Sequence, residues 1–324
     1  MLSRMAEALY WMTRYLERSS DTARLLDISL LHLLEAEDGI SEAAQWKPLL
    51  SITSSEEQYQ ELYPGAEVSA ARVIQFMTHE PKNPNSIRSS LRLARENARV
   101  VRDRISKEMW QAMNDTWLTL DRQLGRPLTP ERAAAVYTGV RNGVARFHGI
   151  TIGTMMRGEA FGFYLLGLAL ERADMAARIL DVKYHLLLPD LSMVGSPLDY
   201  YQWAALLKSL SGFEAYRRRY QSGLRPIDVG AFVIFEADFP RSLRFNVDRM
   251  LQALDEVAEG DEKSPSRAAA RGLLEYLESH SPKSVFEMGL HEFLEGFLDR
   301  IAELNTALAA EFFEAYAASR EIRD

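Results

Sequence analysis

Residues 6–27 read AEALYWMTRYLERSSDTARLLD, and residues 160–181 read AFGFYLLGLALERADMAARILD. The two stretches align without a gap, 154 residues apart, and share a tyrosine, a Glu-Arg pair and a closing Ala-Arg-x-Leu-Asp. Tyrosine, glutamate and arginine recur seven residues apart in both copies. Seven residues are about two helical turns with only ~20° of drift, so all three side chains project from nearly one face. We infer a duplicated helical framework built around buried or half-buried charge.

The composition excludes several classes of protein. The chain has 324 residues, a net charge of −8 and no cysteine. An acidic balance argues against non-specific binding of nucleic acid. Without cysteine there is no disulfide framework, thiolate nucleophile or Cys-ligated zinc site. Glu7, Arg14 and Glu17 interrupt what would have to be the apolar core of a signal peptide, and no apolar run is long enough to cross a bilayer. We therefore expect a soluble cytoplasmic protein that binds neither nucleic acid nor membrane.

A helical seam follows Asn83-Pro84, which is typical of an N-cap with proline at the first helical position. Apolar residues then step 4-3-4-3-4 at Ile87, Leu91, Ala94, Ala98, Val101 and Ile105. Arginines keep the same rhythm one residue later, at Arg88, Arg92, Arg95, Arg99 and Arg102. The spacing predicts a helix with a basic stripe beside an apolar one, about 21 Å long. Such arginine stems usually lie along the edge of a bundle with their charges in water.

Helical spacing dominates the rest of the chain. Further helices are predicted over Glu131–Val144, Tyr200–Tyr220, Arg241–Val257, Arg267–Ser279 and His291–Ser319. The apolar run Val229–Phe235 could be a strand, but it has no partner run, so a buried helix segment is the better interpretation. Polar breaks are predicted at Ser51–Gly65, Leu188–Pro197 and Glu259–Ser266. We expect an all-α, elongated helical bundle that forms a single domain over residues 1–324; two bundles divided within Asp121–Pro130 are the alternative.

Common catalytic signatures are missing from the sequence. There is no P-loop, no dinucleotide-binding glycine pattern, no nucleophile elbow and no His-Glu-x-x-His. None of the six histidines has a glutamate three residues before it, which helical di-metal sites use. Asp181 and His185 lie four residues apart and make at most half a metal site. We therefore predict no catalytic residue, no metal and no cofactor.

The Glu-Arg pairs have two interpretations. Glu17 and Glu171 could be buried carboxylates paired with arginines of a neighbouring helix, of which the Arg88–Arg102 helix is the nearest supply. Alternatively, arginines of both copies converge on a carboxylate or phosphate, which guanidinium groups bind in a bidentate fashion. Pro240-Arg241-Ser242, followed by Arg244, also resembles a helix start that suits an anion. The candidate binding residues are Glu17, Arg18, Arg24, Arg88, Arg92, Arg95, Arg99, Glu171, Arg172, Arg178, Arg241 and Arg244.

Five stretches carry a resemblance to a known family. They are LSRMAEALYWMTRYLERSSDTARLLD (2–27), NPNSIRSSLRLARENARVVRDRIS (83–106), LERADMAARILDVKYHLLLP (170–189), DYYQWAALLKSLSGFEAYRRRY (199–220) and FPRSLRF (239–245). Together they resemble the bacterial alpha-E family, an all-helical family named for its Glu-Arg motif. The similarity covers essentially the whole chain.

The resemblance implies which proteins this chain acts with. Alpha-E proteins are usually found with circularly permuted ATP-grasp proteins, transglutaminase-like proteases and N-terminal-nucleophile hydrolases. It implies an accessory protein of an ATP-dependent peptide-ligating or peptide-modifying system, which binds the ligase or an acidic peptide substrate. The alternatives are an enzyme that uses Glu17 and Glu171 as acid and base on an arginine-held carboxylate, and a scaffold that acts by oligomerisation. Basic groups clustered at Arg88–Arg102, Arg172–Arg178, Arg217–Arg219 and Arg241–Arg244 predict an anionic partner.

Overall fold

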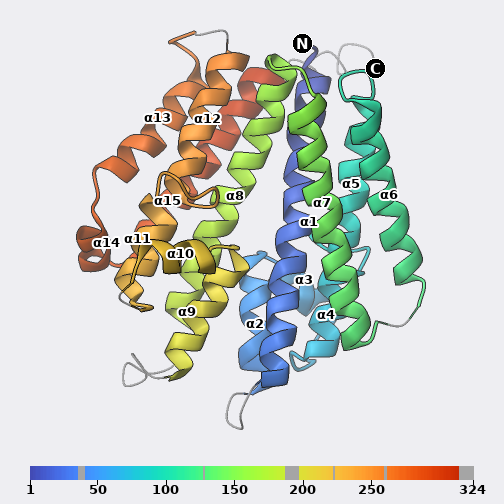
Figure 1. Ribbon diagram of the computed structural model, residues 1–324, viewed down its shortest axis with the longest axis vertical. Helices are drawn as coiled ribbons and strands as arrows, with labels where there is room; N and C mark the ends of the chain where they lie inside the picture. The colour runs from blue at the N-terminus through green and yellow to red at the C-terminus, as the bar shows by residue number, and fades with distance from the viewer. Residues whose placement is uncertain (36–40, 127, 187–196, 222, 259–260, 314–324) are drawn as a thin grey trace.

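A computed structural model describes residues 1–35, 41–126, 128–186, 197–221, 223–258 and 261–313 (Figure 1). These residues form fifteen α-helices and one short π-helix, with no β-strand among them. The predicted all-α fold is confirmed. The helices are α1 (Ser3–Glu35), α2 (Glu42–Ile52), α3 (Glu56–Leu62), α4 (Ala70–Thr78), α5 (Ile87–Val100), α6 (Lys107–Leu124), α7 (Pro130–Thr154), α8 (Glu159–Leu186), α9 (Pro197–Ser209), α10 (Phe213–Arg219), α11 (Pro226–Phe235), α12 (Leu243–Val257), α13 (Pro265–Glu278), α14 (Pro282–Met288), α15 (Leu290–Leu308) and η2 (Ala309–Phe313).

The long helices form two groups of four that meet at the centre of the molecule (Figure 1). In the first group α1 packs on α5 and α7, and α6 packs on both of these. In the second group α8 packs on α12 and α15, and α13 packs on both of these. Helices α1 and α8 pack against each other and join the groups. The boundary between the groups lies between Thr154 and Glu159; within Asp121–Pro130 the chain instead passes from α6 to α7, which are neighbours in one group.

The two groups place their related helices at corresponding positions. Helix α1 carries the first Glu-Arg copy and α8 carries the second, and each is the helix through which its group packs against the other. A duplicated ancestor would produce this arrangement, and the internal duplication itself stays a prediction. For the site, the consequence is that both Glu-Arg motifs face the same central contact.

Serine caps start α5, which packs on α1, and α12, which packs on α8. Ser86 Oγ accepts a hydrogen bond from Ser89 N at 3.2 Å at the start of α5, and Ser242 Oγ accepts one from Phe245 N at 3.0 Å at the start of α12. The cap of α5, Ser86, therefore lies three residues after Asn83, the predicted cap. The Asn83 side chain instead holds the preceding turn, because its amide donates to Phe76 O at 3.2 Å and its carbonyl accepts from Asn85 N at 2.9 Å.

The apolar seam is confirmed, but the helix that carries it is shorter than predicted. All six seam residues are buried, whereas α5 ends at Val100. Val101 and Ile105 lie in the turn that reverses the chain into α6, and the N-cap Ser106 starts that helix. Arg102 therefore lies beyond α5, and the basic stripe does not run along a single helix.

Two other predicted boundaries are wrong for local reasons. The segment Tyr200–Tyr220 is not one helix, because α9 ends at Ser209 and α10 begins at Phe213. Between them Ser211 adopts φ 53°, and a Cβ on Gly212 would lie 2.7 Å from the ring of Phe239, so the chain breaks where two elements meet closely. The predicted break Ser51–Gly65 contains the end of α2 and the whole of α3.

The remaining predictions mostly agree with the structure. Val229–Phe235 lies in α11, a buried helix, as expected. The Glu131–Val144, Arg241–Val257 and Arg267–Ser279 predictions match α7, α12 and α13, although α7 continues ten residues further, to Thr154. The last prediction matches α15 and η2 up to Phe313, and its final residues lie outside the described part of the chain. Most of Leu188–Pro197 and the side chain of His185 also lie outside it.

Helices α1 and α8 approach closely at a glycine. A Cβ on Gly167 of α8 would lie 2.3 Å from the carbonyl oxygen of Tyr10 and 3.3 Å from Cβ of Thr13. No larger residue fits there without a shift of one helix. The contact brings the backbone of α8 onto that of α1, one turn before the second Glu-Arg motif. In the described part of the chain, no helix combines the length and hydropathy that crossing a bilayer requires.

Candidate functional site

Glu171 on α8 lies in a cage of guanidinium groups from α1. Its side chain is 1 % exposed. Arg14 Nε donates to Oε2 at 2.7 Å, and Arg18 donates from Nε to Oε1 at 2.6 Å and from Nη2 to Oε2 at 3.0 Å. Arg18 therefore binds the carboxylate in a bidentate manner, and Arg14 adds a third charge-assisted bond.

Glu17 on α1 has an equally complete set of partners. Arg172 Nε donates to Oε1 at 2.9 Å, and Arg241 Nη2, from the turn before α12, donates to the same oxygen at 2.6 Å. His148 Nε2 on α7 lies 2.9 Å from Oε2. The carboxylate is 1 % exposed, so these three side chains replace water around it.

The two Glu-Arg motifs pair crosswise. Glu17 binds Arg172, the arginine that follows Glu171, and Glu171 binds Arg18, the arginine that follows Glu17. Burial alone would raise the pKa of each carboxyl. Arg172 and Arg241 nevertheless hold the pKa of Glu17 well below its usual value, and Arg18 with Arg14 lowers that of Glu171. Both glutamates are therefore ionised at neutral pH.

The tyrosine of each copy forms a hydrogen bond to a partner of one of the glutamates. Tyr10 OH donates to Asn305 Oδ1 on α15 at 2.7 Å and accepts from Arg14 Nη1 at 3.1 Å. Tyr164 OH lies 2.7 Å from His148 Nδ1. Because the ionised Glu17 only accepts, His148 Nε2 carries the proton that points at it, and a neutral His148 then accepts from Tyr164 at Nδ1. Burial raises the pKa of Tyr164, so this hydroxyl keeps its proton.

A further carboxylate extends the Glu17 cluster. Asp21 Oδ1 accepts from Arg24 Nη1 at 2.6 Å and from Arg241 Nη1 at 2.7 Å. Arg241 thus bridges Glu17 and Asp21 and is 11 % exposed. At the corresponding place before α5, Asn85 accepts from Arg18 Nη1 at 3.1 Å. The predicted anion site at Pro240-Arg241-Ser242 is therefore filled by the protein's own carboxylates.

The Arg88–Arg102 stripe supplies none of these partners, contrary to the prediction. Arg88 pairs with Asp121 at 3.1 Å, Arg95 donates to Asn114 at 2.9 Å, and Arg99 pairs with Glu96 at 2.8 Å. The partners of Arg88 and Arg95 lie on α6, and Arg92 is exposed. The glutamates are reached instead by arginines of α1, of α8 and of the turn before α12.

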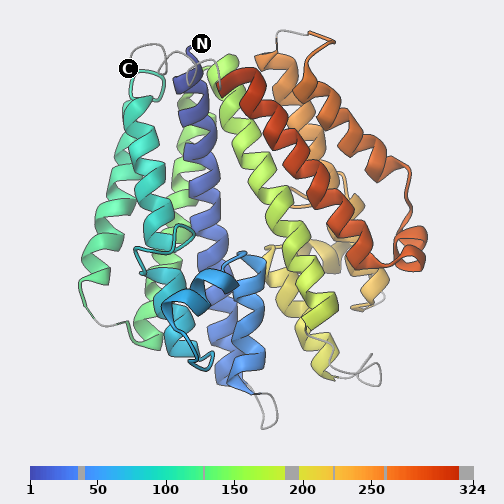
Figure 2. The same cartoon turned by 180° about the vertical axis from the view of Figure 1, so that it is seen from behind.

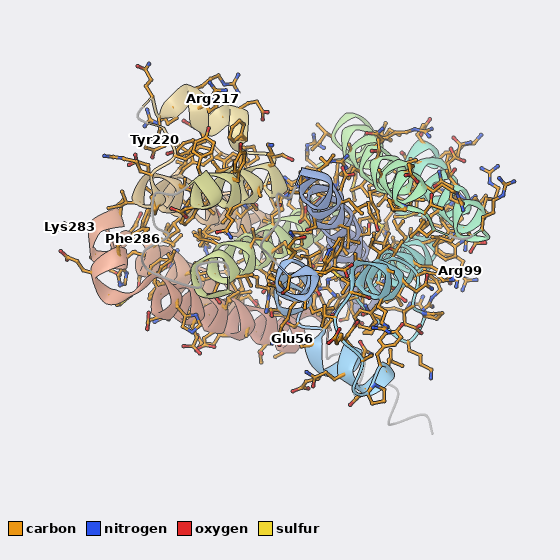
Figure 3. All side chains as sticks on the ribbon, turned by 90° about the horizontal axis from the view of Figure 1, so that it is seen from below. Glu56, Arg99, Arg217, Tyr220, Lys283 and Phe286 are labelled. Carbon is orange, nitrogen blue, oxygen red and sulfur yellow. The ribbon has the colours of Figure 1, made fainter. Side chains whose placement is uncertain are left out.

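The other candidate arginines also form local pairs. Arg178 binds Asp174 at 3.0 Å within α8, and Arg244 binds Asp248 at 3.1 Å and Glu278 at 3.0 Å. Figure 3 places Arg99 and Arg217 on widely separated parts of the surface, so the basic clusters do not form one patch. Of the predicted binding residues, the central contact brings together Glu17, Arg18, Arg24, Glu171, Arg172 and Arg241.

Comparison with known proteins agrees with this geometry. Residues 1–313 match Alpha-E, described as a predicted alpha-helical domain with a conserved ER motif. The chain belongs to the Alpha-E family. Glu17-Arg18 and Glu171-Arg172 are both ER sequences, and their crossed pairing shows what such a pair does in this Alpha-E chain.

Longer mycobacterial proteins contain a segment similar to this Alpha-E chain. Uncharacterised proteins of Mycobacterium bovis and of two Mycobacterium tuberculosis strains are 23 % identical over 264 residues, which cover 76 % of this chain and 29 % of the relatives. The chain thus spans less than a third of the length of these curated relatives. No solved structure matches it.

A pocket of about 280 Å³ opens beside Glu171 in the Alpha-E fold. Helices α1, α2, α8 and α15 surround it together with the turn before α5, and Figure 2 shows these elements from behind. Its lining includes Arg14, Arg18, Asp174 and Arg178 but not Glu17, so the two motif glutamates do not share this space. Among the described residues, no group of three or more His, Asp or Glu side chains is arranged to hold a metal ion.

Sequence reasoning missed several partners in this site. Arg14 lies three residues before Glu17 on the same helix face, so its spacing was a usable signal. Asn85 and Arg241 follow proline and precede a capping serine in both groups, which also marks equivalent positions. His148 and Asn305 lie in segments without any shared pattern, and only the fold brings them to the central contact.

Proposed function

We propose that this Alpha-E domain is a non-catalytic accessory protein of an ATP-grasp-dependent system for peptide ligation or modification, where it binds the ligase or its peptide substrate. One observation carries the proposal: both motif glutamates are buried and ionised, and each has a complete set of partners, guanidinium groups for Glu171 and two guanidinium groups with the His148 imidazole for Glu17. Their chemistry is that of counterions inside a bundle. If the Glu-Arg pairs serve to join the two groups of helices, partner binding falls to the outer surfaces of the domain.

The enzyme alternative requires a different electrostatic arrangement. A general acid must hold a proton near the working pH, so its pKa has to be raised, whereas those of Glu17 and Glu171 are lowered. A general base must reach its substrate in an open site, and each glutamate is 1 % exposed. Both observations favour the accessory role.

One finding, together with the family resemblance, supports the proposal of a partner. The relatives are more than three times as long as the segment matched, so in those proteins the helical domain stands beside other polypeptide in the same chain. The family resemblance supplies the nature of that partner, a circularly permuted ATP-grasp protein. This chain would meet it as a separate protein or as a domain.

Exposed arginines offer a surface for an acidic partner. Arg92, Arg99 and Arg102 are exposed near α5, and Arg217 and Arg218 are exposed on α10. Positive charge concentrated in a chain of net charge −8 steers anionic partners, and salt screens such attraction within about 8–10 Å. Binding carried by these residues should therefore weaken as salt rises.

The test is calorimetry with the ATP-grasp protein encoded beside this chain, at low and at high salt. We expect binding that weakens with salt, and no ATP turnover by the chain alone. The double variant Arg92→Glu/Arg99→Glu should weaken binding about tenfold or more, while Arg146→Glu, an equally exposed change on α7, should have little effect. ATP turnover by the purified chain would overturn the accessory role, and absence of binding at low salt would overturn the partnership.

A further inference from the structure

The pocket beside Glu171 has a polar wall rich in hydrogen-bond donors. Arg14 and Arg18 reach it from α1, and Arg178 reaches it from α8. Each guanidinium has five N–H groups and makes three hydrogen bonds to described residues. Each therefore keeps donors beyond those that hold it in place.

The charges of this wall leave one positive charge in excess. Three arginines line the pocket, and Glu171 and Asp174 are the carboxylates among its lining residues. Glu171 is enclosed by Arg14 and Arg18, and Asp174 binds Arg178 through both oxygens at 3.0 and 3.2 Å. The fixed carboxylates orient the guanidinium groups, and the remaining charge matches one monoanion.

Much of the remaining lining of the pocket is apolar. Leu298, Ile301 and Ala302 of α15 face the pocket, with Leu170 and Met175 of α8 and Ile52 of α2. Ile301 is buried, whereas Ala302 is exposed at the rim. A ligand that fills this space therefore contacts guanidinium groups and also apolar side chains.

The geometry points to a pocket that binds a monocarboxylate carrying an apolar group, namely the C-terminal residue of a peptide with an aliphatic side chain. The carboxylate lies against Arg18 and Arg178, and the side chain lies against Leu298 and Ile301. The choice of a peptide rather than a free acid rests on the proposed function. A volume of about 280 Å³ is just below the range of about 300–1,000 Å³ typical of drug-sized ligands, which suits one or two residues.

A phosphate fits this pocket less well. Guanidinium groups bind phosphate and carboxylate with the same geometry, so hydrogen bonding alone does not separate them. A phosphate monoester is largely dianionic at neutral pH, because its second pKa is about 6, and inorganic phosphate is dianionic in part. One excess positive charge compensates a carboxylate fully and a dianion only in part, and phosphate has no apolar group for the α15 wall.

The test is to titrate the full chain with four probes and to measure binding by calorimetry and NMR. The probes are N-acetyl-leucine, Ala-Ala-Leu, Ala-Ala-Leu amide and inorganic phosphate. We expect both free carboxylates to bind and the amide to bind at least about tenfold more weakly, because it loses the charge-assisted bonds. Tighter binding of Ala-Ala-Leu than of N-acetyl-leucine supports a peptide source. Equal affinity for peptide and amide, or tighter binding of phosphate, would overturn the assignment.

Two variants test the residues. Arg178→Gln should reduce the affinity for Ala-Ala-Leu about tenfold, and Ala302→Trp should block the rim at an exposed position that tolerates the change. Arg141→Gln is the matched control: Arg141 is 29 % exposed, binds Asp27 and contacts the Thr138 hydroxyl, as Arg178 is 33 % exposed, binds Asp174 and contacts the Ser54 hydroxyl. Equal loss of binding in Arg178→Gln and Arg141→Gln would place the effect in stability and contradict the pocket.

The two experiments distinguish failure of the pocket proposal from failure of the proposed partnership. Carboxylate binding without binding to an ATP-grasp protein would retain the pocket and reject the partnership. Binding to the ATP-grasp protein that is unchanged in Ala302→Trp, together with no carboxylate binding, would reject the pocket alone.

Discussion

At the scale of the residue, Glu17 and Glu171 each exchange water for a complete set of cationic donors. Such a pair is not a large source of stability, because removing two charges from water is costly. The loss of one member is costly for the same reason, since it leaves its partner buried and uncompensated. The crossed arrangement makes two arginines depend on Glu17, namely Arg172 and Arg241.

Glu17→Gln should therefore lower the free energy of unfolding by about 3–5 kcal/mol. Denaturation with urea, monitored by circular dichroism, measures the change. Asp115→Asn is the control, because Asp115 and Arg146 form an exposed pair with side chains 58 % and 57 % exposed, and the expected loss is at most about 1 kcal/mol. Similar losses in both variants would mean that Glu17 is not held in a buried network.

The lowered pKa of Glu171 has a definite sign for acid stability. The usual pKa of a glutamate is 4.5, and that of Glu171 is lower in the folded chain. Below pH 4.5 the Glu171 carboxylate therefore binds more protons in the unfolded than in the folded chain. Its contribution is present above pH 4.5 and is lost as the pH falls through the lower folded pKa. Below pH 4.5, the free energy of unfolding of Glu171→Gln should depend less steeply on pH than that of the natural chain. Parallel curves from urea denaturation across that range would contradict the lowered pKa.

At the scale of the element, the close approach of α1 and α8 depends on one position. Gly167→Ala would place a methyl group 2.3 Å from the carbonyl oxygen of Tyr10. We expect a destabilisation of about 1–3 kcal/mol, although alanine favours a helix intrinsically. In Gly149→Ala, also within a helix, the added Cβ meets nothing within 4 Å, so we expect a gain of up to about 1 kcal/mol. Melting temperatures compare the two, and a stabilised Gly167→Ala would disprove the close contact.

The elements were largely predictable, and their junctions were not. Spacing of apolar residues identified the seam that begins in α5, because periodicity follows directly from which face is buried. The buried helix α11 was predicted differently, from a continuous apolar run that has no partner run. The break at Ser211 and Gly212 depends on Phe239, which is distant in sequence, so a local pattern carries no sign of it. The ladder placed Glu17 in the site, but its partners His148 and Arg241 lie 131 and 224 residues away. Only the tertiary fold identifies such partners.

At the scale of the whole molecule, the two groups of helices exchange counterions. Glu17 belongs to the first group and is bound by Arg172 and Arg241 of the second, while Glu171 belongs to the second and is bound by Arg14 and Arg18 of the first. Neither group on its own supplies the arginine partners of its glutamate.

A chain divided between Met156 and Arg157 tests this dependence. Each piece produced alone should lack a cooperative thermal transition, because its central helix exposes both an apolar face and unpaired charges. The two pieces produced together should assemble and recover the helical spectrum of the whole chain. A cooperative transition in either piece alone would show that the groups are independent domains.

The crossed pairing also constrains how the sequence can change with descent. A substitution at Arg172 removes a hydrogen-bond partner of Glu17, in the other half of the chain, and a substitution at Arg18 removes one of Glu171. At these positions, a substitution in one half of the chain is therefore expected to require a compensating substitution in the other half. Across an alignment of the family, residues 17 with 172 and 18 with 171 are expected to change together, whereas the adjacent pairs 17 with 18 and 171 with 172 are expected to covary less.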